Sequence, residues 1–166
     1  MEYSQVRELV KSKDVDGLIA ALNDKDKHVR NYAADGLREL GDKRAVDSLI
    51  TVLSDKNMDV RRAVAQALGE LGDKKAVDSL IMVLNDTTDY LVIKEPLQVP
   101  SMPIDARIEA ALALGKIGGE AAIEALKAVA DTSKKQGYYR GLSLNEAVEK
   151  ALAELGVGDR EEKQIS

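Results

Sequence analysis

The chain has 166 residues, a formal net charge of −5 and an apolar fraction of 45%, but it contains no Cys, Phe or Trp. A chain of this length commonly forms one domain, and its core must here be built from Ala, Leu, Val and Ile. The lack of Cys excludes disulfides and thiolate nucleophiles, and the single histidine, His28, excludes a multi-histidine metal centre. The acidic balance disfavours a nucleic-acid partner. Because no apolar run resembles a signal peptide or a membrane span, we expect a cytoplasmic protein without a membrane partner.

The first predicted element is a helix over residues 2–10, interpreted as an N-terminal cap because Leu9 lies one repeat period before Leu40. The repeats begin after it. Val15–Ile19 recurs as Val46–Ile50 and again as Val77–Ile81, each time 31 residues further on. Each repeat contains two apolar stripes with helical spacing, with Asp or Asn caps in the turns and a glycine at the end.

The period of 31 residues fails twice in the second half of the chain. Arg61 has its counterpart at Arg107, 46 residues on, so the third repeat carries 15 extra residues, and the fourth carries 7. We therefore predict one domain with repeats over about 12–41, 42–72, 73–118 and 119–156, insertions at about 87–104 and 132–142, and a tail over 157–166. Because each helix pair leaves an apolar face that only the next pair can cover, the nine predicted helices must stack as an α-solenoid.

The segment Asp59–Val77 resembles the HEAT-like repeat of the phycocyanobilin-lyase type, whose pattern is roughly V-R-x-x-A-A-x-A-L-G-x-L-G-D-x-x-A-V. The resemblance covers the chain apart from the insertions and the tail. It implies a right-handed α-solenoid, and it implies that Arg30, Arg61 and Arg107 are structural arginines that bind acidic and carbonyl groups in the turns. Such repeats occur in lyases, hydroxylases and adaptors, so the resemblance leaves the function open. The iron-binding hydroxylases use several His-Glu pairs and are excluded by the single His28.

The candidate binding residues lie in the insertions and on one row of the second helices. This row is polar in three repeats but apolar at Ile108 and Leu112, and the first insertion holds all three prolines and the strand-forming run Tyr90–Ile93. The turns between first and second helices project from one edge, and neighbouring helices stand about 10 Å apart, so we expect the two insertions to adjoin. Tyrosine and arginine are typical of interface hot spots. The predicted binding residues are Tyr90, Leu91, Ile93, Leu97, Ile108, Leu112, Tyr138, Tyr139 and Arg140. Alternatively, the first insertion folds over Ile108 and Leu112 only to shield them.

No motif in the sequence indicates catalysis, a metal or a cofactor, although acid–base chemistry by a carboxylate or tyrosine stays open. The leading hypothesis is a non-catalytic scaffold or adaptor that binds a protein partner through its concave face and its insertion-bearing edge. Two copies could also associate through the first insertion. The alternative is a lyase- or chaperone-like subunit that holds a chromophore or prosthetic group, as the family resemblance suggests.

Overall fold

The computed structural model describes residues 1–86, 106–133 and 144–157, without the side chains of residues 132 and 133. These ranges contain the nine α-helices predicted from the sequence and two short 3₁₀ turns. The α-helices are α1 (Tyr3–Lys11), α2 (Val15–Ala21), α3 (Lys27–Leu40), α4 (Val46–Val52), α5 (Met58–Leu71), α6 (Val77–Leu84), α8 (Ala106–Ile117), α9 (Glu120–Ser133) and α10 (Leu144–Glu154). The 3₁₀ turns Lys43–Ala45 and Lys74–Ala76 precede α4 and α6.

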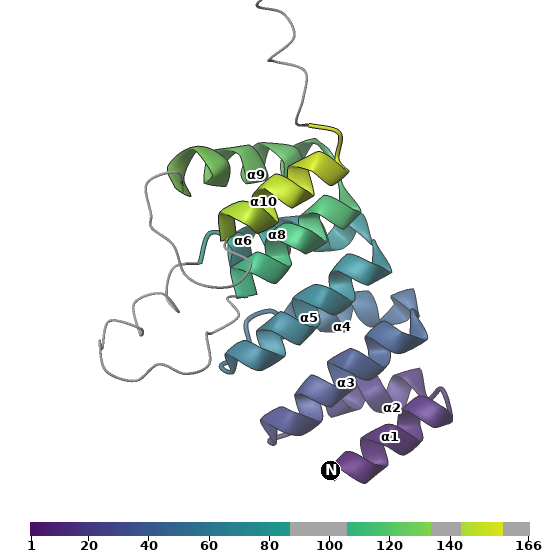
Figure 1. The fold of residues 1–166 in the computed structure, drawn as a ribbon. Coiled ribbons are helices and arrows are strands. Elements are labelled where there is room, and N and C mark those ends of the chain that lie inside the picture. Colours follow the sequence, from purple (N-terminus) through teal and green to yellow (C-terminus); the bar gives the residue numbers. More distant parts are fainter. Residues whose placement is uncertain (87–105, 134–143, 158–166) are drawn as a thin grey trace, which may run out of the picture.

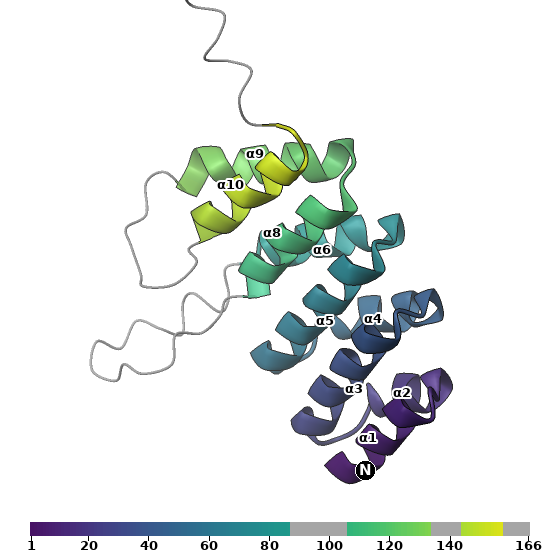
Figure 2. The same ribbon diagram turned by 45° about the vertical axis from the view of Figure 1, so that its right-hand side comes forward.

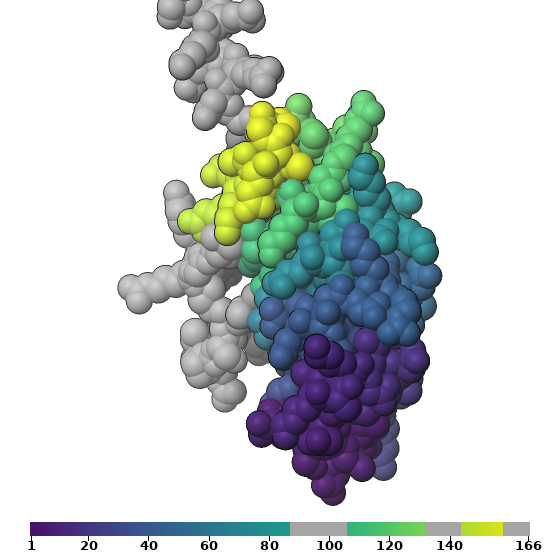
Figure 3. All heavy atoms as spheres, turned by 90° about the vertical axis from the view of Figure 1, so that its right-hand side faces the viewer, coloured from purple at the N-terminus to yellow at the C-terminus, as the bar shows by residue number. Residues whose placement is uncertain are grey.

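The helices form two layers (Figures 1 and 2). The second helices of the repeats, α3, α5, α8 and α10, pack side by side in one layer, with α1 against α3 at the end of the row. The first helices, α2, α4, α6 and α9, form the other layer. The repeats follow one another along the long axis, as the successive bands of colour in Figure 3 show. The predicted α-solenoid, including its N-terminal capping helix, is confirmed.

Local sequence signals fix where the second helices begin and end. Asp26 caps α3 by accepting a hydrogen bond from the His28 N–H, and Asn57 caps α5 in the same way. Gly41 and Gly72 follow α3 and α5 with φ of +67° and +65°, a left-handed conformation that glycine adopts without a Cβ penalty. The capping residues predicted in these turns are therefore confirmed.

The core runs unbroken along the stack. Leu18, Leu49, Leu80 and Leu126 occupy one repeat position in the first helices, and Leu37, Leu68 and Leu114 occupy one in the second helices; all are fully buried. Alanine fills much of the remaining interior, for example at Ala33, Ala67 and Ala110. Small residues let helices approach closely, which is how a core without Phe or Trp stays filled.

The second insertion, predicted at about 132–142, begins close to the end of a long helix. α9 continues to Ser133, and at 14 residues it is twice as long as α4. The alanine-rich sequence of α9 favours helix, so part of the extra length of the fourth repeat extends that helix. The rest of this insertion and the whole of the first, at about 87–104, lie outside the described residues.

Candidate functional site

The candidate surface is the solvent-facing side of α5, α8 and α10, which we name the second-helix surface. Its residues occupy three equivalent positions in each helix: Arg62, Gln66 and Glu70; Ile108, Leu112 and Lys116; and Glu146, Lys150 and Glu154. The Lys116 Nζ lies 3.9 Å from the Glu70 Oε1. This contact shows that equivalent positions of neighbouring helices lie side by side on this surface.

Glycines bring the three helices of this surface unusually close together. A Cβ placed on Gly69 of α5 would lie 2.8 Å from the Ala113 Cα, and one on Gly115 of α8 would lie 2.7 Å from the Ala151 Cα. Real Cβ atoms do not approach backbone atoms to such distances, so only glycine allows this packing. The second-helix surface therefore rests on a tightly packed base.

Ile108 and Leu112 are the apolar centre of the second-helix surface. Both side chains are half-buried and pack against the core, so they are less exposed than the sequence pattern indicated. The reason is the close approach of the neighbouring helices. Their remaining exposed area still lies among charged and polar positions, because the equivalent positions are polar in α5 and α10.

The other predicted binding residues lie outside the described ranges. These are Tyr90, Leu91, Ile93 and Leu97 of the first insertion and Tyr138, Tyr139 and Arg140 of the second. The predicted clustering of the insertion tyrosines therefore stays a prediction.

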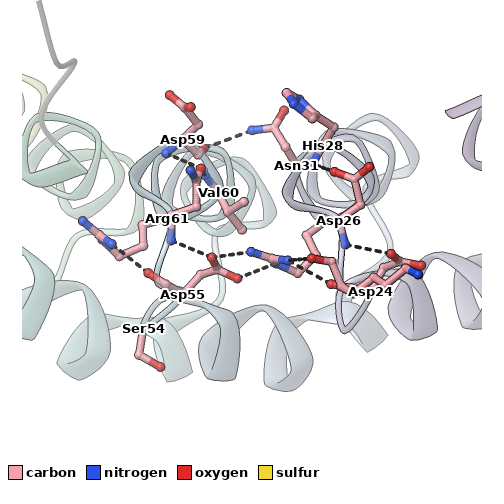
Figure 4. A network of polar contacts seen from close by, with 12 residues as sticks. Asp24, Asp26, His28, Asn31, Ser54, Asp55, Asp59, Val60 and Arg61 are labelled. Atoms are coloured by element: carbon pink, nitrogen blue, oxygen red, sulfur yellow. Dashed lines mark hydrogen bonds and ion pairs between the residues drawn. The ribbon is translucent and has the colours of Figure 1, made fainter. Parts of the chain in front are cut away.

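Arg30 has the structural role that the repeat pattern implied, and Figure 4 shows the network of polar contacts around Asp24 and Asp55, its partners. Its Nε and Nη2 donate to the two carboxylate oxygens of Asp55 in the next repeat, at 2.6 and 2.8 Å, and its Nη1 donates to the Asp24 and Lys25 carbonyls. Arg61 donates to the Asp55 carbonyl at 2.7 Å. The guanidinium of one repeat thus joins the turn of its own repeat to the turn of the next.

Electrostatics inside this cluster favour the charged pair. Burial alone would raise the pKa of the Asp55 carboxyl, but hydrogen bonds from Arg30 and from the Asn57 N–H outweigh it, and the pKa lies below its usual value. The hydrogen bond to Asp55 likewise raises the pKa of Arg30. With only 7% and 10% of the two side chains exposed, the pair is a buried ion pair that holds the turns together.

The structure adds two surface clusters that the sequence analysis missed. Arg38 contacts Asp35 and reaches Glu70 on the next helix at 3.4 Å. At the N-terminal end, the ring centroids of Tyr3 and Tyr32 lie 4.2 Å apart, and both side chains are exposed. Neighbouring second helices face each other with an offset slightly below the 31-residue period, so comparing residues about 29 apart could have found the tyrosine pair.

Within residues 1–86, 106–133 and 144–157, no group of three His, Cys, Asp or Glu side chains is arranged to hold a metal ion. No helix in that part of the chain has the length and apolar character needed to cross a bilayer.

Similarity to known proteins agrees with this architecture. Residues 15–98 match HEAT repeats, and residues 106–132 match the PBS lyase HEAT-like repeat. The chain therefore belongs to the HEAT repeat family, and its resemblance to the phycocyanobilin-lyase type of repeat is confirmed.

The solved structures that match include one that resembles nearly the whole chain. It is the complex of CpcE and CpcF of phycocyanin lyase from Nostoc sp. PCC7120, in which the matching chain is 32% identical with a TM-score of 0.68. The match covers 92% of the present chain but only 58% of the other, so the present chain spans little more than half the length of that neighbour. No curated protein is significantly similar to the chain.

Proposed function

We propose that the protein is a lyase-like subunit that holds a chromophore or related prosthetic group and works together with a protein partner. The observation that carries this proposal is the 32% identity, over 92% of the chain, to a chain of the phycocyanin lyase complex. A shared fold alone does not define a function, and it is the identity over nearly the whole chain that makes this neighbour informative.

The second-helix surface is consistent with this function. Its centre is apolar at Ile108 and Leu112, and charged side chains surround it. Ligand sites typically combine an apolar lining with a few placed polar groups. Because the glycine contacts hold α5, α8 and α10 tightly, such a surface needs little rearrangement to bind.

Titration with a linear tetrapyrrole tests the proposal. The purified chain is titrated with biliverdin and followed by visible absorbance and by circular dichroism in the visible bands. Saturable spectral change with an induced dichroic signal is expected, since a bound flexible pigment is held in one twisted conformation. Spectra that remain the sum of protein and pigment would contradict the proposal. Titration with a cyclic tetrapyrrole carboxylate is the control for non-specific pigment binding.

A second candidate is the protein-binding adaptor expected from the sequence, using the concave face and the insertion-bearing edge. It is favoured by the two-chain complex in which the structural neighbour occurs. The insertions at about 87–104 and 132–142 are the segments proposed to reach the partner. Replacing Thr88–Ser101 by a short turn tests this by light scattering and thermal unfolding. A folded variant that loses a dimer or partner supports the adaptor, whereas loss of folding supports a shielding role.

A further inference from the structure

The turns that precede α4 and α6 are each joined to the repeat before them by an ion pair at the same two repeat positions. The Arg44 Nη1 lies 3.6 Å from the Asp16 Oδ1, and the Lys75 Nζ lies 3.1 Å from the Asp47 Oδ1. The two cations are 31 residues apart in the sequence, and so are the two carboxylates. The same exposed ion pair therefore recurs at the first two junctions between repeats.

The third junction, between α6 and α9, lacks the cation of this pair. The carboxylate is present as Asp78 on α6, but the repeat position of Lys75 is held by Ala121, 46 residues further on. Because alanine cannot form an ion pair, this position of α9 makes no such contact with the repeat before it.

The turn that leads into α9 also differs from the two regular turns. Asp42 and Asp73 each accept a hydrogen bond from the backbone N–H two residues on, at 2.9 and 3.0 Å, and each opens a 3₁₀ turn. The repeat position of Asp73 is held by Gly119, and α9 begins directly after it at Glu120. Gly118 and Gly119 have φ of +74° and +103°, and a Cβ on Gly119 would meet open space. Two adjacent glycines without a side-chain cap form a permissive joint.

The regular 3₁₀ turns also cover the first helix of the preceding repeat, and α6 lacks this cover. The turn Lys74–Ala76 contacts α4, where Val46 and Val52 are 2% and 8% exposed. The equivalent valines of α6, Val77 and Val83, are partly exposed, because α9 follows α6 without such a turn. The junction between α6 and α9 is thus more open than the junction between α4 and α6.

α9 itself contributes few buried side chains. In residues 120–131 only Ala122 and Leu126 are buried, whereas α4 buries three side chains in half the helix length. In the other helix layer, Gly115 of α8 packs directly against Ala151 of α10. The fourth repeat is therefore held firmly through its second helix and weakly through its first.

We propose that α9 is a hinged helix, which swings away from α6 about Gly118 and Gly119 while α8 and α10 stay packed. Opening uncovers the valines of α6 and the two buried side chains of α9, so an apolar surface is presented only while the helix is open. The segment 134–143 separates α9 from α10, and a chain of this length can span up to about 33 Å, so α9 moves without drawing α10 along. This hinge goes beyond the proposed function and does not depend on it, since it needs no ligand.

Single cysteines at one repeat position test the hinge. Ala45, Ala76 and Ala122 are equivalent and fully buried, and the chain has no cysteine of its own. The thiol of Ala122→Cys reacts with a water-soluble aryl disulfide when α9 opens, whereas the thiol of Ala76→Cys reacts only when the ion-paired turn before α6 opens. Each rate is divided by the rate in the urea-unfolded variant. Labelling of Ala122→Cys is expected to be at least about tenfold faster than labelling of Ala76→Cys or Ala45→Cys.

Hydrogen exchange provides a second measurement that needs no buried substitution. Ala121→Lys supplies the missing cation opposite Asp78 and is expected to slow exchange of the α9 amides about two- to fivefold, the range of one exposed ion pair. Ala121→Gln is the matched control, which lacks the charge and should leave exchange nearly unchanged. The α10 amides are expected to exchange slowly in all three proteins, although α10 also lies at the end of the stack.

Circular dichroism and urea unfolding establish that the cysteine variants are folded and equally stable. Faster labelling of Ala122→Cys together with slow exchange in α10 supports the hinge. Equal labelling of Ala122→Cys and Ala76→Cys would overturn it, because both thiols then await the same unfolding event. Exchange in α10 as fast as in α9 would also overturn it, since the whole repeat then opens rather than α9 alone.

Discussion

The N-terminal and C-terminal halves of the solenoid join their helices by different means. Between the first and second repeats, polar contacts add to the apolar core: Arg30 of α3 binds Asp55 in the turn before α5, and Arg38 reaches Glu70. From α5 to α8 and from α8 to α10, glycine packs directly against alanine. The repeat position held by Arg38 is held by Gly69 in the next repeat and by Gly115 in the one after. The same position therefore forms an ion pair in one repeat and a close backbone contact in the next two. The glycine–alanine backbone contacts thus lie between the second and third repeats and between the third and fourth.

The largest loss of stability is expected from breaking the ion pair between Arg30 and Asp55. Arg30→Met leaves the Asp55 carboxylate buried without its partner, and such losses cost about 3 kcal/mol or more. Urea unfolding followed by circular dichroism measures this change.

The double variant Arg30→Met/Asp55→Leu is the control for that prediction. Removing both charges leaves no isolated buried ion, so most of the lost stability should return. A double variant as unstable as Arg30→Met would show that the arginine acts through its contacts with the Asp24 and Lys25 carbonyls instead.

The close contact in the C-terminal half gives a smaller expected loss. Gly115→Val forces its side chain into the Ala151 backbone, and overpacking of this kind costs about 1–3 kcal/mol. Ala153 of α10 occupies the equivalent position and is exposed, so Ala153→Val should change stability far less. Thermal unfolding of the two variants compares them, and equal losses would contradict the close contact.

Acid should destabilise the protein less than Arg30→Met does. Protonation leaves the buried Asp55 carboxyl neutral, whereas the substitution leaves it charged and without its partner. The pKa of Asp55 is lowered in the folded chain. The stability from this group is therefore complete above its unfolded pKa of about 3.9 and is lost as the pH falls through the folded value. Urea unfolding between neutral pH and pH values below about 4 should show a flatter decline for Arg30→Met/Asp55→Leu than for wild type. Parallel declines would contradict a lowered pKa.

The smallest loss of stability is expected at Arg38, whose ion pairs with Asp35 and Glu70 lie at the surface. Arg38→Gln removes contacts to Asp35 and Glu70, but about a third of the arginine side chain is exposed, so the loss should stay below about 1 kcal/mol. A shift in the urea midpoint as large as that of Arg30→Met would contradict this ranking.

The sequence predicted the fold well because the repeat signals are local. The apolar stripes, the Asp26 and Asn57 caps and the left-handed glycines at residues 41 and 72 each act within a few residues, and each recurs. The length of α9 was not predictable in the same way, because an insertion counted from repeat spacing does not say whether its residues extend a helix.

The candidate site was only partly predictable. The apolar pair Ile108 and Leu112 stood out from the repeat pattern, but the glycine contacts that hold its helices together depend on which residues face each other across two helices. Which residues face each other is set by how far one helix is shifted along its neighbour, and this shift is a property of the packing.

Hydrogen exchange with and without biliverdin tests most directly the claim that the C-terminal second helices form the binding surface. Slower amide exchange is expected in α8 and α10 when the pigment is bound, with α1 and α3 unchanged. Protection confined to α1 and α3, or no change in α8 and α10 at saturating pigment, would contradict the claim.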